Sequence, residues 1–220
     1  MHDDQHGTAT VTLAAVLSAL RETGRPSHEG MVCAQIGLGA AGLGIARLLM
    51  DYGFNVVGVD PSAESQKRFQ DCGGTNVTLD EALLKGDVVI STTGVVDLIK
   101  PEMIREGQII FALSNPVPEI SPEAALAAGA AFAADGKSVN NALAFPGLFK
   151  AALMVECQEI TSEMKIAAAK AISQHADPGE IVPSVFHPDV HSSVINAVTA
   201  LFDDELRPSS EFKHRVSYRP

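Results

Sequence analysis

Short apolar runs alternate with longer amphipathic segments along most of the chain. The apolar runs have the length of strands, and we expect strands at 31–36, 55–59, 87–91, 109–113 and 131–134. Helical patterns lie between and after them, at 8–20, 40–52, 62–69, 79–84, 121–128, 145–157, 161–175 and 188–203, with a helical turn at 101–105. This alternation predicts an α/β fold: a Rossmann-like, doubly wound parallel sheet followed by a C-terminal helical segment.

The same pattern predicts one domain, because neither a repeat nor a linker interrupts it. We assign residues 1–205 to this domain and 206–220 to a polar C-terminal tail, which we expect to be loosely held. Hydrophobic residues make up 46% of the chain and aromatic residues only 5%, without tryptophan, so the core must be aliphatic. That composition suits buried parallel strands covered by alanine-rich helices.

Charge and cysteine content narrow the classes of function. A net charge of −11 argues against nucleic acid or an anionic membrane as a partner, because both require a cationic face. No apolar run reaches the roughly 20 residues of a membrane span. The cysteines Cys33, Cys72 and Cys157 are isolated and lack metal-ligand spacing, which fits a reducing compartment. Acidic residues rather than a signal peptide follow Met1, so we expect a cytoplasmic protein.

A glycine-rich turn lies between the first expected strand and the helix that follows it. The motif is Gly37-x-Gly39-Ala40-Ala41-Gly42. In a dinucleotide site the first glycine allows the tight turn, the second lets the backbone approach a pyrophosphate, and the third allows close packing of helix on strand. The N–H groups at the helix start then face the anion. A Rossmann-like turn that binds no nucleotide is the alternative.

The end of the second expected strand supports the nucleotide interpretation. Asp60 stands there, where an acid can accept hydrogen bonds from the adenosine ribose hydroxyls. Its charge should repel a 2′-phosphate, which favours NAD over NADP. Lys67 and Arg68 follow in the next helix and could offset that repulsion, so NADP stays open.

Two further strand ends carry small or amide residues. Thr92, Thr93 and Gly94 follow the strand at 87–91 and are small enough for a cofactor to lie close; an ordinary turn is the alternative. Asn115 follows the strand at 109–113, and its amide could bind a carboxylate or a carboxamide. A structural Asx turn is the alternative there. Ligands of open α/β sheets bind at such strand ends.

Candidate metal ligands are few. Asp3 and Asp4 are hard oxygen donors that could bind Mg²⁺ or Mn²⁺, although two acids at a chain start are more often solvated or cap a helix. His187 and His191 have metal-ligand spacing on an expected helix, but no third ligand accompanies them, so a solvated helix start is the better interpretation. No Gly-x-Ser-x-Gly motif and no cysteine in a nucleophile setting is present.

Taken together, these motifs resemble the NAD(P)-binding domain of malic enzymes of the prokaryotic type. The resemblance covers about residues 1–201 and keeps the family's order. Its motifs are His-Asp-Asp-Gln-His-Gly-Thr from His2, the glycine turn, Ala-Leu-Ser-Asn-Pro-Val-Pro-Glu-Ile from Ala112, Asn-Asn-x-Leu-x-Phe-Pro-Gly-x-Phe from Asn140, and Ile-Thr-Ser-Glu-Met-Lys from Ile160.

The resemblance implies oxidation of malate by NAD or NADP and decarboxylation to pyruvate with Mg²⁺ or Mn²⁺. It implies that Asp4, beside Asp3, binds the metal, and that Asn115, Asn140 and Asn141 bind the carboxylates of the small dicarboxylate. The resemblance also implies that Asn115 lies near the nicotinamide. A homodimer is the expected assembly.

The family's catalytic Tyr, its base Lys and its first metal carboxylates precede the Asp-Asp motif, and Tyr52 and Tyr218 stand in no matching motif. The loop before Asn140 is also shorter than in the family. Three hypotheses follow. The chain is a cofactor half that works with a catalytic half, supplied by a separate chain or absent from this sequence; a stand-alone NAD(H)-binding module without malate activity; or another NAD-dependent oxidoreductase on the same fold.

Overall fold

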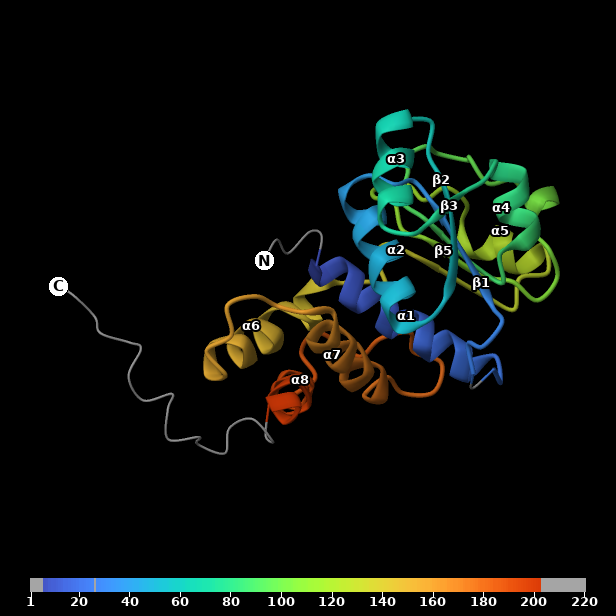
Figure 1. Ribbon diagram of the computed structural model, residues 1–220. Coiled ribbons are helices and arrows are strands. Elements are labelled where there is room, and N and C mark those ends of the chain that lie inside the picture. The colour runs from blue at the N-terminus through green and yellow to red at the C-terminus, as the bar shows by residue number, and fades with distance from the viewer. Residues whose placement is uncertain (1–5, 26, 203–220) are drawn as a thin grey trace.

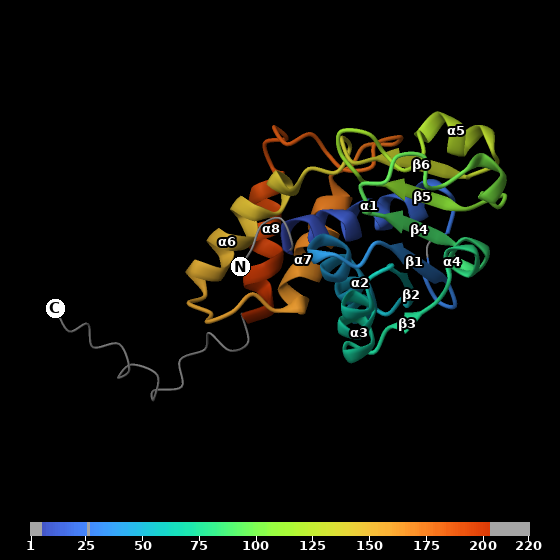
Figure 2. The same ribbon diagram turned by 90° about the horizontal axis from the view of Figure 1, so that it is seen from above.

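The computed structural model describes residues 6–25 and 27–202, which form a parallel sheet between two layers of helices (Figure 1, Figure 2). The six strands lie in the order β3-β2-β1-β4-β5-β6, and every neighbouring pair is parallel. This order is that of a doubly wound dinucleotide-binding sheet, so the predicted fold class is confirmed. The strands are β1 Val32–Ile36, β2 Asn55–Val59, β3 Thr75–Asn76, β4 Val88–Ser91, β5 Ile109–Ala112 and β6 Phe132–Asp135.

The helices cover both faces of the sheet and extend past one end of it. Helices α1 to α3 and α6 to α8 lie on one side, whereas α4 and α5 cover the other (Figure 1). The helices are α1 Thr8–Glu22, α2 Ala40–Tyr52, α3 Ala63–Asp71, α4 Leu79–Lys85, α5 Pro122–Ala127, α6 Phe145–Met154, α7 Ser162–Gln174 and α8 Val190–Thr199, with short 3₁₀ turns η2 Pro101–Met103, η3 Asn141–Leu143 and η4 Ala200–Phe202.

Alternating strand residues belong to two separate cores. Val88 and Ile90 of β4 pack with the α1–α2 side, and Val89 between them packs with the α4–α5 side. Because successive side chains of a strand point to opposite faces, a strand covered on both faces must be apolar throughout. The continuous apolar runs of the sequence are therefore the signature of this sheet.

Local capping residues set several helix starts. Ser62 accepts a hydrogen bond from the N–H of Ser65 at the start of α3, and Ser121 does the same for Ala124 at the start of α5. Thr78 and Glu81 form a reciprocal capping box on α4. Such side chains satisfy N–H groups that have no partner within the helix, which fixes where the chain enters it.

Some predicted elements differ from the structure. β3 was not predicted, because a two-residue strand leaves no periodic pattern. Residues 101–105 form only a 3₁₀ turn over Pro101–Met103. The last predicted helix starts at Val190 rather than at 188, so placing His187 on a helix with His191 was wrong: Asp189 directly precedes the helix, and His187 lies before it. The predicted tail at 206–220 lies outside the described residues, so the domain boundaries stay a prediction.

Candidate functional site

The three motif glycines have different surroundings at the turn between β1 and α2. Gly37 has a φ of +90°, which favours glycine, and a Cβ there would lie 2.9 Å from the carbonyl oxygen of Thr92. A Cβ on Gly42 would lie 1.9 Å from the carbonyl oxygen of Gly37, so α2 can approach β1 only with glycine there. Gly39 is exposed, and a Cβ on it would meet no atom within 4 Å. The backbone at Gly39 is therefore open to a ligand.

The carboxylate of Asp60 joins the end of β2 to this turn. It accepts a hydrogen bond of 2.7 Å from the N–H of Leu38 and one of 2.8 Å from the N–H of Ser62. Asp60 is half-buried and each carboxylate oxygen can accept more than one hydrogen bond, so capacity for ribose hydroxyls remains. The sequence assigned Asp60 and the glycine turn to one dinucleotide site, and the structure brings the two together.

A buried glutamine, which the sequence reasoning missed, ties the glycine turn to the loop after β4. The Nε2 of Gln35 donates to the carbonyl oxygen of Gly37 and to the Oγ1 of Thr92, both at 3.0 Å. β1 and β4 are the strands between which the sheet order reverses, and ligands of such sheets bind in the crevice there. A polar residue inside an otherwise apolar expected strand was the signal that could have identified Gln35, which the structure shows to be fully buried.

A second missed residue, Glu119, lies beneath the loops after β4 and β5. Its side chain is fully buried. Its Oε1 accepts hydrogen bonds from the N–H of Thr93 at 2.6 Å, the hydroxyl of Thr93 at 2.8 Å and the hydroxyl of Ser114 at 2.6 Å. Burial raises the pKa of the Glu119 carboxyl, but the hydrogen bonds from Ser114 and Thr93 outweigh burial and hold that pKa below its usual value. Glu119 is therefore a buried carboxylate anion.

The amide candidates follow β5 and β6, which are neighbours in the sheet. Asn115 is exposed and forms a cis peptide bond with Pro116. A Cβ on Gly136, just after β6, would lie 2.6 Å from the Asn115 side-chain nitrogen, so the two loops touch. Asn140 caps η3 by accepting a hydrogen bond of 2.9 Å from the N–H of Ala142, and Asn141 is the first residue of η3.

The metal candidates are not brought together within the described residues. Asp3 and Asp4 lie outside them, and across residues 6–25 and 27–202 no group of three His, Cys, Asp or Glu side chains is arranged to hold a metal ion. His187 accepts a hydrogen bond from the N–H of Asp189 and its ring contacts that of His175. His187 therefore contacts a neighbouring N–H group and the His175 ring rather than a group of metal ligands.

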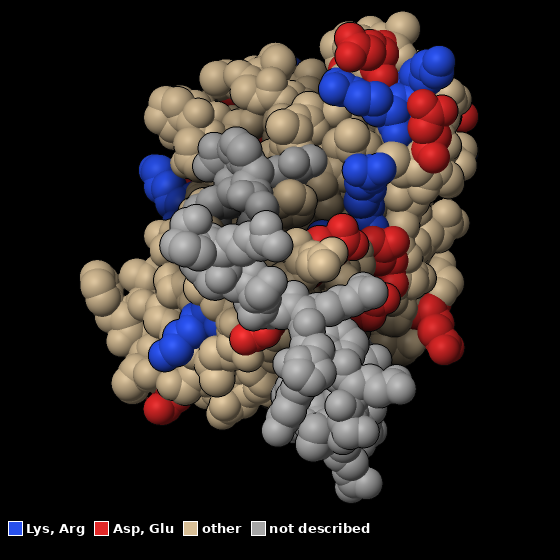
Figure 3. Space-filling view, turned by 60° about the vertical axis from the view of Figure 1, so that its left-hand side comes forward, with Lys and Arg blue, Asp and Glu red and all other residues tan. Residues whose placement is uncertain are grey.

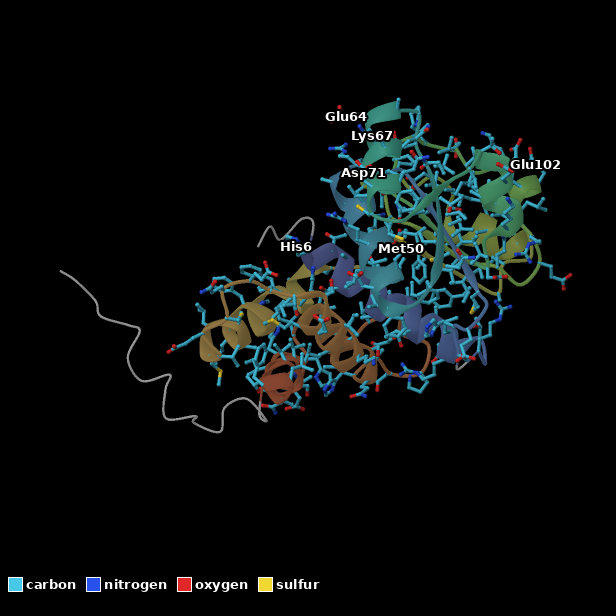
Figure 4. The ribbon with its side chains drawn as sticks, viewed as in Figure 1. His6, Met50, Glu64, Lys67, Asp71 and Glu102 are labelled. Atoms are coloured by element: carbon cyan, nitrogen blue, oxygen red, sulfur yellow. The ribbon has the colours of Figure 1, made fainter. Side chains whose placement is uncertain are left out.

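A partly open pocket of about 380 Å³ lies elsewhere, where the start of α1, the outer side of α2 and the start of α7 meet. His6 and Met50 line it, at the places that Figure 4 labels. Arg47, Lys165 and Asp51 bring charges of both signs to it. Burial lowers the pKa of Lys165, whereas the nearby carboxylate of Asp51 opposes that shift. None of the predicted cofactor or substrate residues lines this pocket.

Charged side chains of both signs lie on one face of the described surface. On the face shown in Figure 3, Lys and Arg side chains are interspersed with Asp and Glu rather than gathered into one basic patch. Within the described part of the chain, no helix is both long enough and apolar enough to cross a membrane.

Two family models match the chain. The model described as the malic enzyme NAD binding domain matches residues 58–200. The model described as the NAD binding domain of D-isomer specific 2-hydroxyacid dehydrogenases matches residues 14–100. The second match ends before β5, whereas the first includes the segments that carry Asn115, Glu119, Asn140 and Asn141.

Individual relatives agree with the first model. The chain is 54% identical to "NAD-dependent malic enzyme 1" of Bacillus subtilis over 200 residues, which are 90% of this chain and 45% of that protein. It is 33% identical over 210 residues to an "NADP-dependent malic enzyme" of Salmonella typhimurium, covering 84% of this chain and 27% of that protein. The crystal structure of malic enzyme from Pyrococcus horikoshii matches with a TM-score of 0.82 and 36% identity, over 93% of this chain and 55% of that chain. The chain thus spans half or less of the length of these two curated relatives.

Proposed function

The chain belongs to the malic enzyme family, and from this membership we propose that it is the NAD-binding half of an enzyme that oxidises malate and releases pyruvate. Membership makes it a part of a malic-enzyme-like oxidoreductase with an NAD(P)-binding fold. The observation that carries the finer proposal is the meeting, at one end of the sheet, of an open glycine turn with the loops that hold Thr93 and Asn115.

Each of these residues has a proposed role toward the cofactor. The N–H groups at the start of α2, from Ala40 to Gly42, bind the pyrophosphate, which approaches over Gly39. Asp60 accepts hydrogen bonds from the adenosine ribose and disfavours a 2′-phosphate, so NAD is preferred to NADP. Thr92 to Gly94 leave room for the second nucleotide. When bound, NAD accepts the hydride from the substrate.

The substrate side rests on amide side chains. We assign Asn115, Asn140 and Asn141 to the carboxylates of malate, because an amide N–H₂ group donates two hydrogen bonds to an anion. The metal assigned to Asp4 and Asp3 stays a prediction. The described residues hold no cluster of ligands for Mg²⁺ or Mn²⁺, so no step is assigned to the metal.

Cofactor binding is tested by calorimetric titration of residues 1–220 with NADH and NADPH. We expect NADH to bind more tightly than NADPH. If neither cofactor binds at millimolar concentration, the proposed NAD-binding function is refuted. A preference for NADPH would contradict only the role of Asp60 and point to Lys67 or Arg68.

Malate turnover is tested separately, because the matched segment is 45% of the Bacillus subtilis relative and 27% of the Salmonella typhimurium relative. With malate, NAD and Mn²⁺, we expect residues 1–220 to reduce nicotinamide at close to the background rate. A missing positioned base alone costs about 10²–10⁴-fold in rate. Addition of the first half of a relative should restore turnover. Rapid turnover by residues 1–220 alone would show that the catalytic groups were misassigned.

The binding and turnover measurements also distinguish the two alternative functions. A stand-alone NAD(H)-binding module would bind NADH but would stay inactive with any added half. Another NAD-dependent oxidoreductase, to which the match at residues 14–100 points, would reduce NAD with a 2-hydroxyacid other than malate.

A further inference from the structure

The loops after β4 and β5 have equivalent positions at the sheet edge. Ser91, the last residue of β4, pairs with Ala112 of β5, so Thr93 and Ser114 each stand two residues beyond their strand. Neighbouring parallel strands bring such residues side by side. Glu119 lies between them, on the segment that runs from β5 toward α5.

One carboxylate orders both loops. Besides its three hydrogen bonds to Oε1, Glu119 accepts a longer one of 3.4 Å from the N–H of Ser114 to Oε2. The network continues outward, because the N–H of Gly94 donates to the Ser114 hydroxyl oxygen at 2.8 Å and the N–H of Val95 donates to the Thr93 hydroxyl oxygen at 3.1 Å. The two loops are thus joined through the Glu119 side chain and through the direct hydrogen bond from Gly94 to Ser114.

The donors to this carboxylate are all neutral. Among the described residues, no Lys, Arg or His forms an ion pair with Glu119, whose negative charge is stabilised by N–H and O–H groups alone. Hydrogen bonds to an ionised acceptor are about twice as strong as neutral ones. Moving Thr93 or Ser114 would leave a buried charge under-solvated, so the loops are held in place.

The loops after β4 and β5 belong to the half of the sheet that binds one of the two mononucleotides of the cofactor. In a doubly wound sheet the β1–β2–β3 half binds one mononucleotide and the β4–β5–β6 half binds the other. The glycine turn and Asp60 belong to the first half, whereas Thr93, Gly94 and Asn115 belong to the second. The adenosine side and the nicotinamide side of the crevice are therefore built by different loops.

We infer that Glu119 is a positioning residue that fixes the Thr93–Gly94 and Ser114–Asn115 loops as one surface for the nicotinamide end of the cofactor. Glu119 is buried beneath the loops and acts through Thr93 and Ser114. This inference rests on the proposed binding of NAD and adds the residue that shapes its nicotinamide subsite.

The test compares two ligands on Glu119→Gln, which keeps the shape of the side chain and removes its charge. NADH reaches both halves of the crevice, whereas ADP-ribose lacks the nicotinamide. We expect the Kd for NADH to rise about tenfold in the variant, the size expected when charge-assisted hydrogen bonds become neutral. The Kd for ADP-ribose should change by less than about twofold. Glu119→Asp, one methylene shorter, should not restore the NADH affinity.

Glu102→Gln is the matched control, because Glu102 is an exposed glutamate on the short helix before β5 (Figure 4). It makes the same change of charge and should leave both dissociation constants unchanged. Equal weakening of NADH and ADP-ribose by Glu119→Gln would indicate a general loss of structure and overturn the inference, as would unchanged binding of both.

Amide hydrogen exchange tests, without any ligand, whether Glu119 holds the two loops in place. In Glu119→Gln the amide hydrogens of Thr93 and Gly94 should exchange faster, while those within β4 keep their protection. Unchanged exchange at Thr93 and Gly94 would overturn the inference. If the parent chain binds neither ligand, the proposed function fails, whereas the exchange result still decides whether Glu119 holds the loops.

Discussion

Alanine at Gly42 and alanine at Gly39 should separate the structural glycine of the turn from the one that faces the ligand. At Gly42 the added Cβ would lie 1.9 Å from the Gly37 carbonyl oxygen, 2.7 Å from the Oγ1 of Thr92 and 2.9 Å from the Nε2 of Gln35. Carbon and oxygen atoms that are not bonded stay more than 3 Å apart, so α2 or the turn must move by about 1 Å.

The cost of Gly42→Ala follows from these contacts. Forcing an extra methyl into a packed site costs about 1–3 kcal/mol. The movement also disturbs the two hydrogen bonds that Gln35 donates, each worth about 1 kcal/mol. The better helix propensity of alanine returns about 1 kcal/mol, because Gly42 is within α2. We expect the free energy of unfolding to fall by about 2–4 kcal/mol.

Gly39→Ala is the matched control in the same turn. Its φ of −65° is accessible to alanine, and the methyl would meet no atom within 4 Å, so the free energy of unfolding should change by less than about 0.5 kcal/mol. NADH binding should nevertheless weaken about tenfold or more, because the methyl occupies the space through which the pyrophosphate approaches the backbone.

Urea denaturation followed by circular dichroism measures the stability of both variants, and calorimetry measures NADH binding. If Gly42→Ala unfolds with the parent's free energy, the helix–strand contact does not require glycine. If Gly39→Ala binds NADH as tightly as the parent, the ligand does not lie over the turn.

Three further outcomes are expected. Asp60→Asn removes the charge that opposes a 2′-phosphate and should lower the ratio of NADPH to NADH dissociation constants; an unchanged ratio in calorimetry would assign cofactor choice elsewhere. Thr78→Ala removes the cap of α4 and should cost about 1 kcal/mol in urea denaturation, whereas a neutral effect would mean that packing alone fixes that helix start. The pKa of Glu119 is lowered by folding, so its charge stabilises the protein above the unfolded pKa and that contribution is lost as pH falls through the folded pKa. The stability difference between the parent and Glu119→Gln should therefore be constant above about pH 5 and narrow below about pH 4.5, and a pH-independent difference would contradict an ionised Glu119.

The sequence by itself determined the type of nearly every element. Continuous apolar runs such as Val88–Ser91 become strands covered on both faces, and the alternation with helices predicts the parallel sheet. The bounds of α2 and β2 were predicted to the residue, because a glycine turn, Gly53 and Asp60 mark them. Malic-enzyme membership was also predicted from motifs in order and is confirmed by the family match. All of this information is local: periodicity, caps and spacing.

The short and marginal elements were less predictable from the same signals. β3 has only two residues and exists because it pairs with β2, so its strand character comes from its neighbour. Helix α8 starts at Val190 and not at Pro188, because its start is set where the chain meets the packed helices rather than by a side-chain cap. The prediction for His187 was wrong for that reason.

Only the tertiary structure decided which residues of the site act together. Asp60 was predicted to bind the same cofactor as the glycine turn, but its hydrogen bond to Leu38 required β1 and β2 to be adjacent. Gln35 stands in no motif, and Glu119 belongs to the motif from Ala112 without a role being predicted for it. Their partners Thr92 and Thr93 are distant along the chain. A side chain's partners depend on strand order and register, and these arise from packing of the whole sheet. The sequence alone therefore indicates the chemistry of single positions, whereas the fold determines which of them share one hydrogen-bond network.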